Sequence, residues 1–199
     1  YGAFIIPGLV MLSVMTTSIN FAAFGIYLPK YNGSIFELMS APISAYEIVI
    51  GYAGAAASKS IIISILILLT STIFVDFYIK HPLLMLLLLA ITSITFSLFG
   101  FIIGIWATNF EKLQLIPLII ITPLVFLGGS FYSISMLPEL WQLVTKFNPI
   151  FYIINGFRWS FFGTSDIDLF TSLSLIVIFL FICLAIIGLI FKTGYRIKG

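Results

Sequence analysis

The sequence predicts an all-α fold, a polytopic bundle of transmembrane helices, from its composition and from the spacing of its charges. The chain of 199 residues is 61% hydrophobic and only 8% charged, whereas soluble domains carry about 25% charged residues. Ionisable residues separate four long uncharged runs, at positions 1–29, 82–110, 113–138 and 169–191. Each run exceeds the roughly 20 residues that a helix needs to cross a bilayer core. Strand-like alternation is absent, so a membrane β-barrel is not predicted.

Five spanning helices fit these four runs and a shorter uncharged run at 60–75. The expected spans are Phe4–Tyr27, Glu47–Tyr78, Leu83–Thr108, Leu113–Phe131 and Leu169–Phe191. In the second span only 16 uncharged residues separate Lys59 from Asp76, so the Gly- and Ala-rich stretch before Lys59 is expected to continue the helix towards one membrane face. Lys59 then lies about one turn inside and extends its ammonium to the interface as an anchor. The alternative is a charge that faces an internal aqueous pathway.

The link between the first two spans contains a predicted short helix, Ile35–Ala41. Asn32-Gly33 is a turn pattern, Ser34 with Glu37 three residues later resembles a capping box, and Pro42 ends the helix. A helix this short needs a surface to pack against. Either it contacts a partner or it is a passive interfacial helix.

The segment 132–168 between the last two spans is predicted to hold two further short helices. Helical spacing relates the apolar residues Leu137, Leu140, Trp141 and Val144. Asn148-Pro149 then interrupts this first helix. The following Ile150–Phe162 is apolar but too short to span a bilayer. A re-entrant helical hairpin is therefore expected, with its backbone ends buried in protein.

Basic residues indicate the orientation. The C-terminal tail carries Lys192, Arg196 and Lys198, and if it is cytoplasmic then the segments around Lys30 and Lys112 are cytoplasmic as well. The short helix at 35–41 then lies on the cytoplasmic side and the segment 132–168 on the external side. The end of the second span that carries Lys59 also lies on the cytoplasmic side.

The sequence lacks the residue patterns of catalysis. His81 is the only histidine, no hydrolase or metalloprotease motif occurs, and no P-loop is present. We therefore predict no catalytic residue, no metal site and no enzyme activity. A net charge of +2 without a basic stripe predicts no nucleic-acid binding. The single Cys183 excludes an internal disulfide, and Gly100 and Gly104 form a G-x-x-x-G motif suited to close helix contact.

Several motifs resemble the permease subunits of ABC-2 type exporters. They are I-P-G-L-V-M at 6–11, F-E-L-M-S-A-P-I-S at 36–44, E-I-V-I-G-Y at 47–52, T-P-L-V-F-L-G-G-S-F-Y at 122–132, L-P at 137–138, N-P-I-F-Y at 148–152 and G-F-R at 156–158. The likeness covers nearly the whole chain. Where family members often have arginine in G-x-x-x-R, this chain has Lys59, which keeps the charge but not the fork geometry.

The resemblance implies one ABC-2 type transmembrane domain over residues 1–199, in a fold of six spans. Five are visible here, and an amphipathic helix and a first span are expected before Tyr1. It implies a multi-pass protein of the inner or plasma membrane with a cytoplasmic C-terminus. The implied partners are an ABC ATP-binding subunit, which binds ATP and Mg, a second permease copy, membrane lipid, and a hydrophobic or amphipathic substrate. No cofactor is expected in this chain.

The resemblance also implies two sets of functional residues. The cytoplasmic coupling helix that docks on the ATPase corresponds to Ile35, Phe36, Glu37, Leu38, Met39 and Pro42. The external re-entrant gate corresponds to Pro138, Trp141, Asn148, Pro149, Tyr152 and Arg158. The alternatives are an ATPase-independent channel or a membrane-complex scaffold. A membrane-embedded enzyme acting on lipid is disfavoured because titratable groups are scarce.

Overall fold

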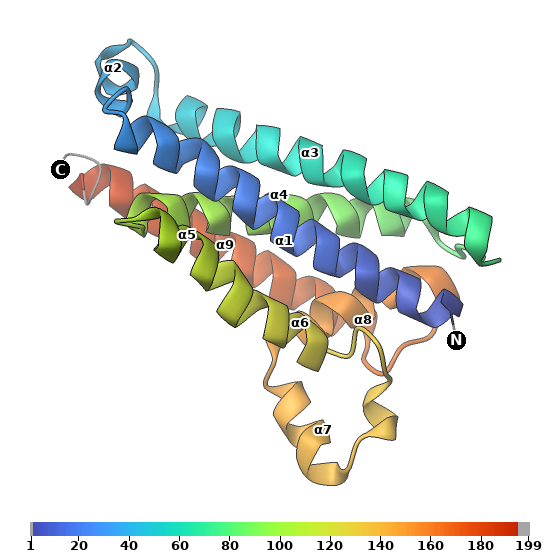
Figure 1. Ribbon diagram of the computed structural model, residues 1–199. Helices are drawn as coiled ribbons and strands as arrows, with labels where there is room; N and C mark the ends of the chain where they lie inside the picture. Colours follow the sequence, from blue (N-terminus) through green and yellow to red (C-terminus); the bar gives the residue numbers. More distant parts are fainter. Residues whose placement is uncertain (1, 195–199) are drawn as a thin grey trace.

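The computed structural model describes residues 2–194 and consists of a helical bundle with short helices at both ends (Figure 1). Five segments are long and apolar enough to cross a membrane, which confirms the five predicted spans. The long elements are α1 (Gly2–Tyr31), α3 (Ala45–Phe74), α4 (Pro82–Trp106), the segment Phe110–Leu127, and α9 (Leu169–Thr193). The short ones are α2 (Ile35–Ser40), the 3₁₀ turn η2 (Ile134–Met136), α7 (Glu139–Lys146) and α8 (Pro149–Phe162).

Helix α4 is the centre of the bundle and packs against α1, α3, α8 and α9. The closest approach is to α1, and the two predicted glycines make it possible. A Cβ at Gly100 would collide with the backbone of Ile19, and a Cβ at Gly104 would collide with the backbone of Ala23. The G-x-x-x-G motif is therefore the surface on which α1 crosses α4.

A cluster of buried hydroxyls joins α1, α3 and α4. Ser18 donates to Ser60 at 2.8 Å, and Ser60 forms a short hydrogen bond with Ser93. All three side chains are fully buried. Because the surroundings offer no water, each hydroxyl must find a partner inside the protein, and here the partners lie on neighbouring helices.

The outward faces of α3 and α9 are apolar. Large aliphatic and aromatic side chains are exposed along both helices, among them Ile62, Leu66, Leu69, Ile73, Ile178, Phe181, Ile182 and Leu189. A soluble protein rarely exposes continuous apolar surface of this extent. Such a surface fits the hydrocarbon of a bilayer, in agreement with the predicted spans.

The sequence predicted the fourth span to be a single regular helix, but the structure shows an interrupted one. It consists of α5 (Phe110–Ile116), a π-helical turn η1 (Pro117–Ile121) and α6 (Thr122–Leu127). Proline lacks an N–H and its ring crowds the carbonyl four residues earlier. Pro123 is the second residue after the wide turn, and the N–H of Thr122 bonds the carbonyl of Pro117 across that turn. The π-turn thus accommodates a proline within a continuous span.

The predicted capping box was placed on the wrong serine. Ser34 has helical backbone angles and its side chain caps nothing, because Gly33 adopts a positive φ of 79° and starts a turn there. The capping box forms ten residues later at the start of α3, where Ser44 and Glu47 bond each other's backbone N–H at 3.3 and 2.6 Å. An N-cap residue needs extended backbone angles, and Ser44 has them.

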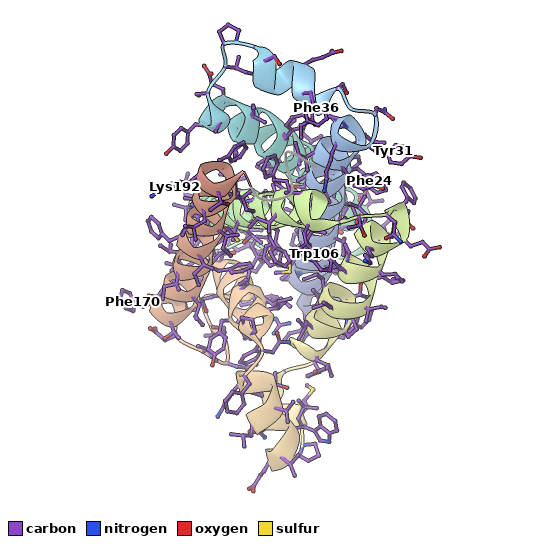
Figure 2. All side chains as sticks on the ribbon, turned by 90° about the vertical axis from the view of Figure 1, so that its left-hand side faces the viewer. Phe24, Tyr31, Phe36, Trp106, Phe170 and Lys192 are labelled. Carbon is purple, nitrogen blue, oxygen red and sulfur yellow. The ribbon has the colours of Figure 1, made fainter. Side chains whose placement is uncertain are left out.

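The two ends of the bundle differ in content. Helix α2 and the C-terminal end of α9 lie together at one end, called the α2 end below (Figure 1). Helix α8, the N-terminus and the projecting α7 lie at the opposite end, called the α8 end. Tyr31 and Phe36 mark the α2 end in Figure 2, where α7 projects at the other extreme. Arg196 and Lys198 of the predicted cytoplasmic tail lie outside the described residues.

Candidate functional site

Among the described side chains of the short helix α2, Ile35 attaches the helix to the bundle. Ile35 is buried in an apolar cluster with Ala22, Ile26 and Val49 of α1 and α3. Its neighbours Phe36 and Glu37 are exposed, Phe36 to 53%. The side chains of Leu38 and Met39 lie outside the described residues. Pro42 is exposed after the helix has ended.

The surface around α2 is rich in exposed aromatic and aliphatic side chains. Tyr31 at the end of α1, Ile43 in the link and Tyr46 in the first turn of α3 are exposed together with Phe36. The backbone beneath them is fixed, because the ammonium of Lys30 donates to the carbonyls of Ile105 and Ala107 at the end of α4. The α2 end therefore presents apolar groups on a well-anchored base.

At the α8 end, four of the six predicted gate residues come together. Pro138, Trp141, Asn148 and Pro149 line a pocket of about 620 Å³, together with apolar side chains of α6 and α7. Tyr152 lies outside this pocket and donates its hydroxyl to the carbonyl of Lys146 at 2.9 Å, which ties α8 to the end of α7.

Asn148 connects two elements at this end, α8 and α6. Its side-chain oxygen accepts from the N–H of Ile150 at 3.0 Å and so caps α8, while its amide donates to the carbonyl of Leu124 in α6 at 2.5 Å. The side chain is buried. Asn148 therefore both starts α8 and attaches it to the fourth span.

Helix α8 is packed into the bundle, whereas α7 is not. Ten residues of α8 are buried, and a glycine with a positive φ of 73°, Gly163, ends the helix. The backbone N–H groups of Lys80 and His81 donate to the carbonyls of Phe161 and Ser160, and the His81 ring stacks on Trp159 with centroids 4.8 Å apart. In α7 the apolar Leu140, Trp141, Leu143 and Val144 are exposed. The two helices are thus not buried as a pair, and a re-entrant arrangement of both stays a prediction.

Arg158 is the buried cation of this end, with 3% of its side chain exposed. It lies on α8, where one of its terminal nitrogens donates to the carbonyl of Gly129 at 2.6 Å, and its guanidinium lies 4.0 Å from the centre of the Phe4 ring. Burial lowers the pKa of Arg158 to about 10, and the nearby Asp166 opposes that shift. The guanidinium is therefore charged at neutral pH.

Lys59 lies in the middle of α3 and its ammonium lies 3.2 Å above the ring of Phe21 in α1. Phe21 precedes Tyr31 by about ten residues, which is roughly 15 Å along a helix. The charge is therefore farther from the α2 end than one helical turn. Lys59 is exposed, and a cation over an aromatic face is stabilised by about 0.5–1 kcal/mol at exposed sites.

Phe21 also borders a groove that was not predicted from the sequence. We call it the polar groove. It has a volume of about 490 Å³ and lies between α1 and the fourth span. Four of its side chains are polar although all belong to predicted spans: Thr16, Asn20, Gln114 and Thr122. Polar side chains inside a span are costly and mark pathways or binding sites. The sequence feature that could have indicated this groove is the pair of amide side chains, Asn20 and Gln114, within apolar runs.

The described residues offer hydrogen-bond donors, acceptors and cations. Among residues 2–194, no group of three or more His, Cys, Asp or Glu side chains is placed to hold a metal ion. What the described residues supply is a partly polar surface along the spans, an apolar platform at the α2 end and a capped α8 end. These are means to bind and guide a molecule.

Comparison with known proteins places the chain among membrane transporters. The family described as ABC-2 type transporter matches residues 1–162. The chain is 37% identical over 180 residues to the inner membrane transport permease YadH of Escherichia coli (strain K12), covering 90% of this chain and 70% of that protein. It is 24% identical over 166 residues to nodulation protein J of Rhizobium leguminosarum bv. viciae, covering 82% and 63%. The corresponding protein of Rhizobium meliloti (strain 1021) is 25% identical over 164 residues.

Proposed function

The chain belongs to the ABC-2 type transporter family, and we propose that it is the permease subunit of an exporter driven by a separate ATP-binding subunit. It is a multi-pass membrane protein of the transport permease class. Paired with a second copy, it forms the translocation pathway for a hydrophobic or amphipathic substrate. ATP and Mg are bound by the partner, and the C-terminus is cytoplasmic.

The observation that carries the proposal is the α2 end. The sequence has no P-loop, and in this proposal the energy for transport arrives through contact with the ATP-binding subunit. Helix α2 offers Phe36 and Glu37 to such a partner while Ile35 holds it against α1 and α3. A small apolar anchor beside a charge is typical of a docking surface. Because α2 joins the ends of α1 and α3, its displacement moves both spans.

The polar groove supports a pathway along α1 and the fourth span. Its amides and hydroxyls can exchange hydrogen bonds with the polar part of an amphipathic substrate, while Phe21, Phe24 and Leu118 of the same groove contact its apolar part. Lys59 adds a positive charge beside Phe21. The π-turn of the fourth span lines this groove, and such turns occur frequently at functional sites.

Phe36→Ala and Glu37→Ala test the docking role. The measurement is the amount of a co-expressed ATP-binding subunit that co-purifies with the permease. We expect at least a tenfold loss of association for the double variant, with an unchanged yield of folded permease. Phe170→Ala is the matched control, because Phe170 is also exposed but begins α9 at the opposite end. Full association of the double variant would remove α2 as the docking site.

Cysteine accessibility tests the groove independently. Cys183 is the only cysteine, so Cys183→Ser gives a background in which Asn20→Cys and Gln114→Cys report on water. We expect membrane-impermeant thiol reagents to label both positions. Ile182→Cys on the exposed face of α9 is the control and should stay unlabelled. Equal labelling of Asn20→Cys and Ile182→Cys would contradict a hydrated pathway at the groove.

A further inference from the structure

Arg158 has hydrogen-bond donors that the described protein does not use. One of its terminal nitrogens donates to Gly129, but Nε and the other terminal nitrogen are buried and have no hydrogen-bond partner. Arginine carries five N–H donors in a fixed plane, and a buried charge is costly unless its donors are satisfied. Thr92 and Ser97 are the other residues with such atoms in the described part of the chain, and both are uncharged.

The acidic neighbour of Arg158 is committed elsewhere. The two carboxylate oxygens of Asp166 accept from the hydroxyl of Ser133 at 2.7 Å and from the N–H of Ile134 at 3.1 Å. These bonds fix the turn η2 to the segment before α9. Asp166 is exposed and acts on Arg158 through its charge alone. Within the described residues, the guanidinium therefore has no bonded counter-ion.

A pocket adjoins the guanidinium. It has a volume of about 570 Å³ and lies at the α8 end, between the first turn of α1 and the segment after α8. Its walls combine Ala3, Phe4 and Phe162 with the polar residues Thr164, Ser165 and Asp166. The hydroxyl of Ser165 donates to the carbonyl of Ile167. The pocket thus offers a buried cation on one side and aromatic, apolar walls on another.

We propose that this pocket binds a phosphate group carried by a membrane amphipath, with Arg158 as its cationic ligand. Phosphate is a strong acceptor for guanidinium donors, and the Phe4 and Phe162 rings suit the apolar chain next to the headgroup. The bound anion supplies the counter-ion that Arg158 lacks. The carboxylate of Asp166 at the pocket weakens this binding by repulsion. The site is separate from the α2 end and from the polar groove, and does not depend on the proposed export function.

Native mass spectrometry of the full chain in an uncharged maltoside detergent tests the proposal. The probes are a short-chain phosphatidic acid, the diacylglycerol with the same chains, and inorganic phosphate. We expect the phosphatidic acid to bind and the diacylglycerol not to bind. Binding of inorganic phosphate with equal affinity supports the site with a free anion as its ligand, whereas weaker binding assigns it to the lipid headgroup. Absence of binding by both anions overturns the proposal.

Two variants link the binding to Arg158. Arg158→Gln should lower the affinity for phosphatidic acid at least tenfold, because it removes the charge. The affinity of Arg158→Lys should lie between that of Arg158→Gln and that of the native protein. Lys146→Gln is the matched control, since Lys146 is an exposed cation at the same end, and it should bind like the native protein. Unchanged binding by Arg158→Gln overturns the proposal and leaves Arg158 as a support for the Gly129 carbonyl.

Asp166→Asn keeps the test decisive if Arg158→Gln does not fold. Asparagine retains an oxygen acceptor for Ser133 or Ile134 but removes the negative charge. We expect phosphatidic acid to bind several-fold more tightly to this variant. Unchanged or weaker binding would contradict a phosphate site beside Arg158, because a structural role of the arginine predicts no gain.

Discussion

Helices α7 and α8 follow one another in the chain, and both are short and carry apolar side chains. They differ in how far they are buried in the bundle. Helix α8 buries ten residues and is held by Asn148 at its start and by the α3–α4 link at its end. Helix α7 leaves Leu140, Leu143 and Val144 exposed and projects from the bundle. Amphipathic spacing shows which face of a helix is apolar, but what covers that face depends on the surrounding elements.

The largest loss of stability should follow from a substitution that separates α8 from α9. A Cβ at Gly156 would lie 2.8 Å from the Cβ of Ser172 in α9, so Gly156→Leu is expected to lower the free energy of unfolding by about 3 kcal/mol. Thermal unfolding can be followed with a thiol-reactive dye, because the only cysteine, Cys183, is buried in the folded protein.

Gly188→Leu is the control for this substitution. Nothing lies within 4 Å of a Cβ at Gly188, so the same change of residue in α9 should leave the unfolding midpoint almost unchanged. Equal midpoints for the two variants would show that the contact of α8 with α9 does not stabilise the fold.

The next effect concerns the start of α8. Asn148→Ala removes the cap on Ile150 and leaves the carbonyl of Leu124 without its amide donor. We expect a loss of about 1–2 kcal/mol in the same unfolding assay. Asn109→Ala removes a comparable cap from Lys112 at the exposed start of α5 and should cost less. A larger loss at Asn109 would contradict the joining role of Asn148.

A smaller effect is expected at the other end of α8. His81 stacks on Trp159 with nearly parallel rings, and His81→Ala should lower the free energy of unfolding by about 0.5–1.5 kcal/mol. His81→Phe retains an aromatic ring and should recover most of the loss. If both variants unfold at the same temperature, the stacking contributes nothing and the backbone bonds of the link alone hold this end.

The smallest effect is expected in α7. Leu143→Ala should change the free energy of unfolding by less than about 0.5 kcal/mol, because the side chain has no cover within the described subunit. A loss similar to that of Asn148→Ala in the same assay would show that the apolar face of α7 is covered in solution. That result would remove the contrast between the two helices.

Much of the fold could be predicted from the sequence because a bilayer imposes strict limits on length and charge. The five spans and the breaks at Pro42 and Pro149 agree with the structure. Local patterns that occur twice could not be resolved: Ser34 with Glu37 and Ser44 with Glu47 have the same spacing, and only the second has the backbone angles of a cap. The choice depends on the turn at Gly33, which tertiary structure sets.

The candidate site was predicted less completely. The family resemblance grouped six residues as a gate, and four of them, Pro138, Trp141, Asn148 and Pro149, line one pocket, whereas Tyr152 and Arg158 do not. Their role as a gate stays a prediction. The polar groove was missed, because Asn20 and Gln114 are 94 positions apart and nothing in the sequence indicates that α1 lies beside the fourth span. The π-turn was missed as well, since a proline in a span can be accommodated in several ways.

The serine cluster of Ser18, Ser60 and Ser93 determines which helices can separate. Hydrogen bonds between these hydroxyls connect α1, α3 and α4. At Gly100 and Gly104 of α4 the backbone of α1 lies so close that a Cβ would collide with it. We therefore expect these three helices to move together. An opening of the subunit is then expected along a boundary of this three-helix unit, for example the one with the fourth span, which contains the π-turn Pro117–Ile121.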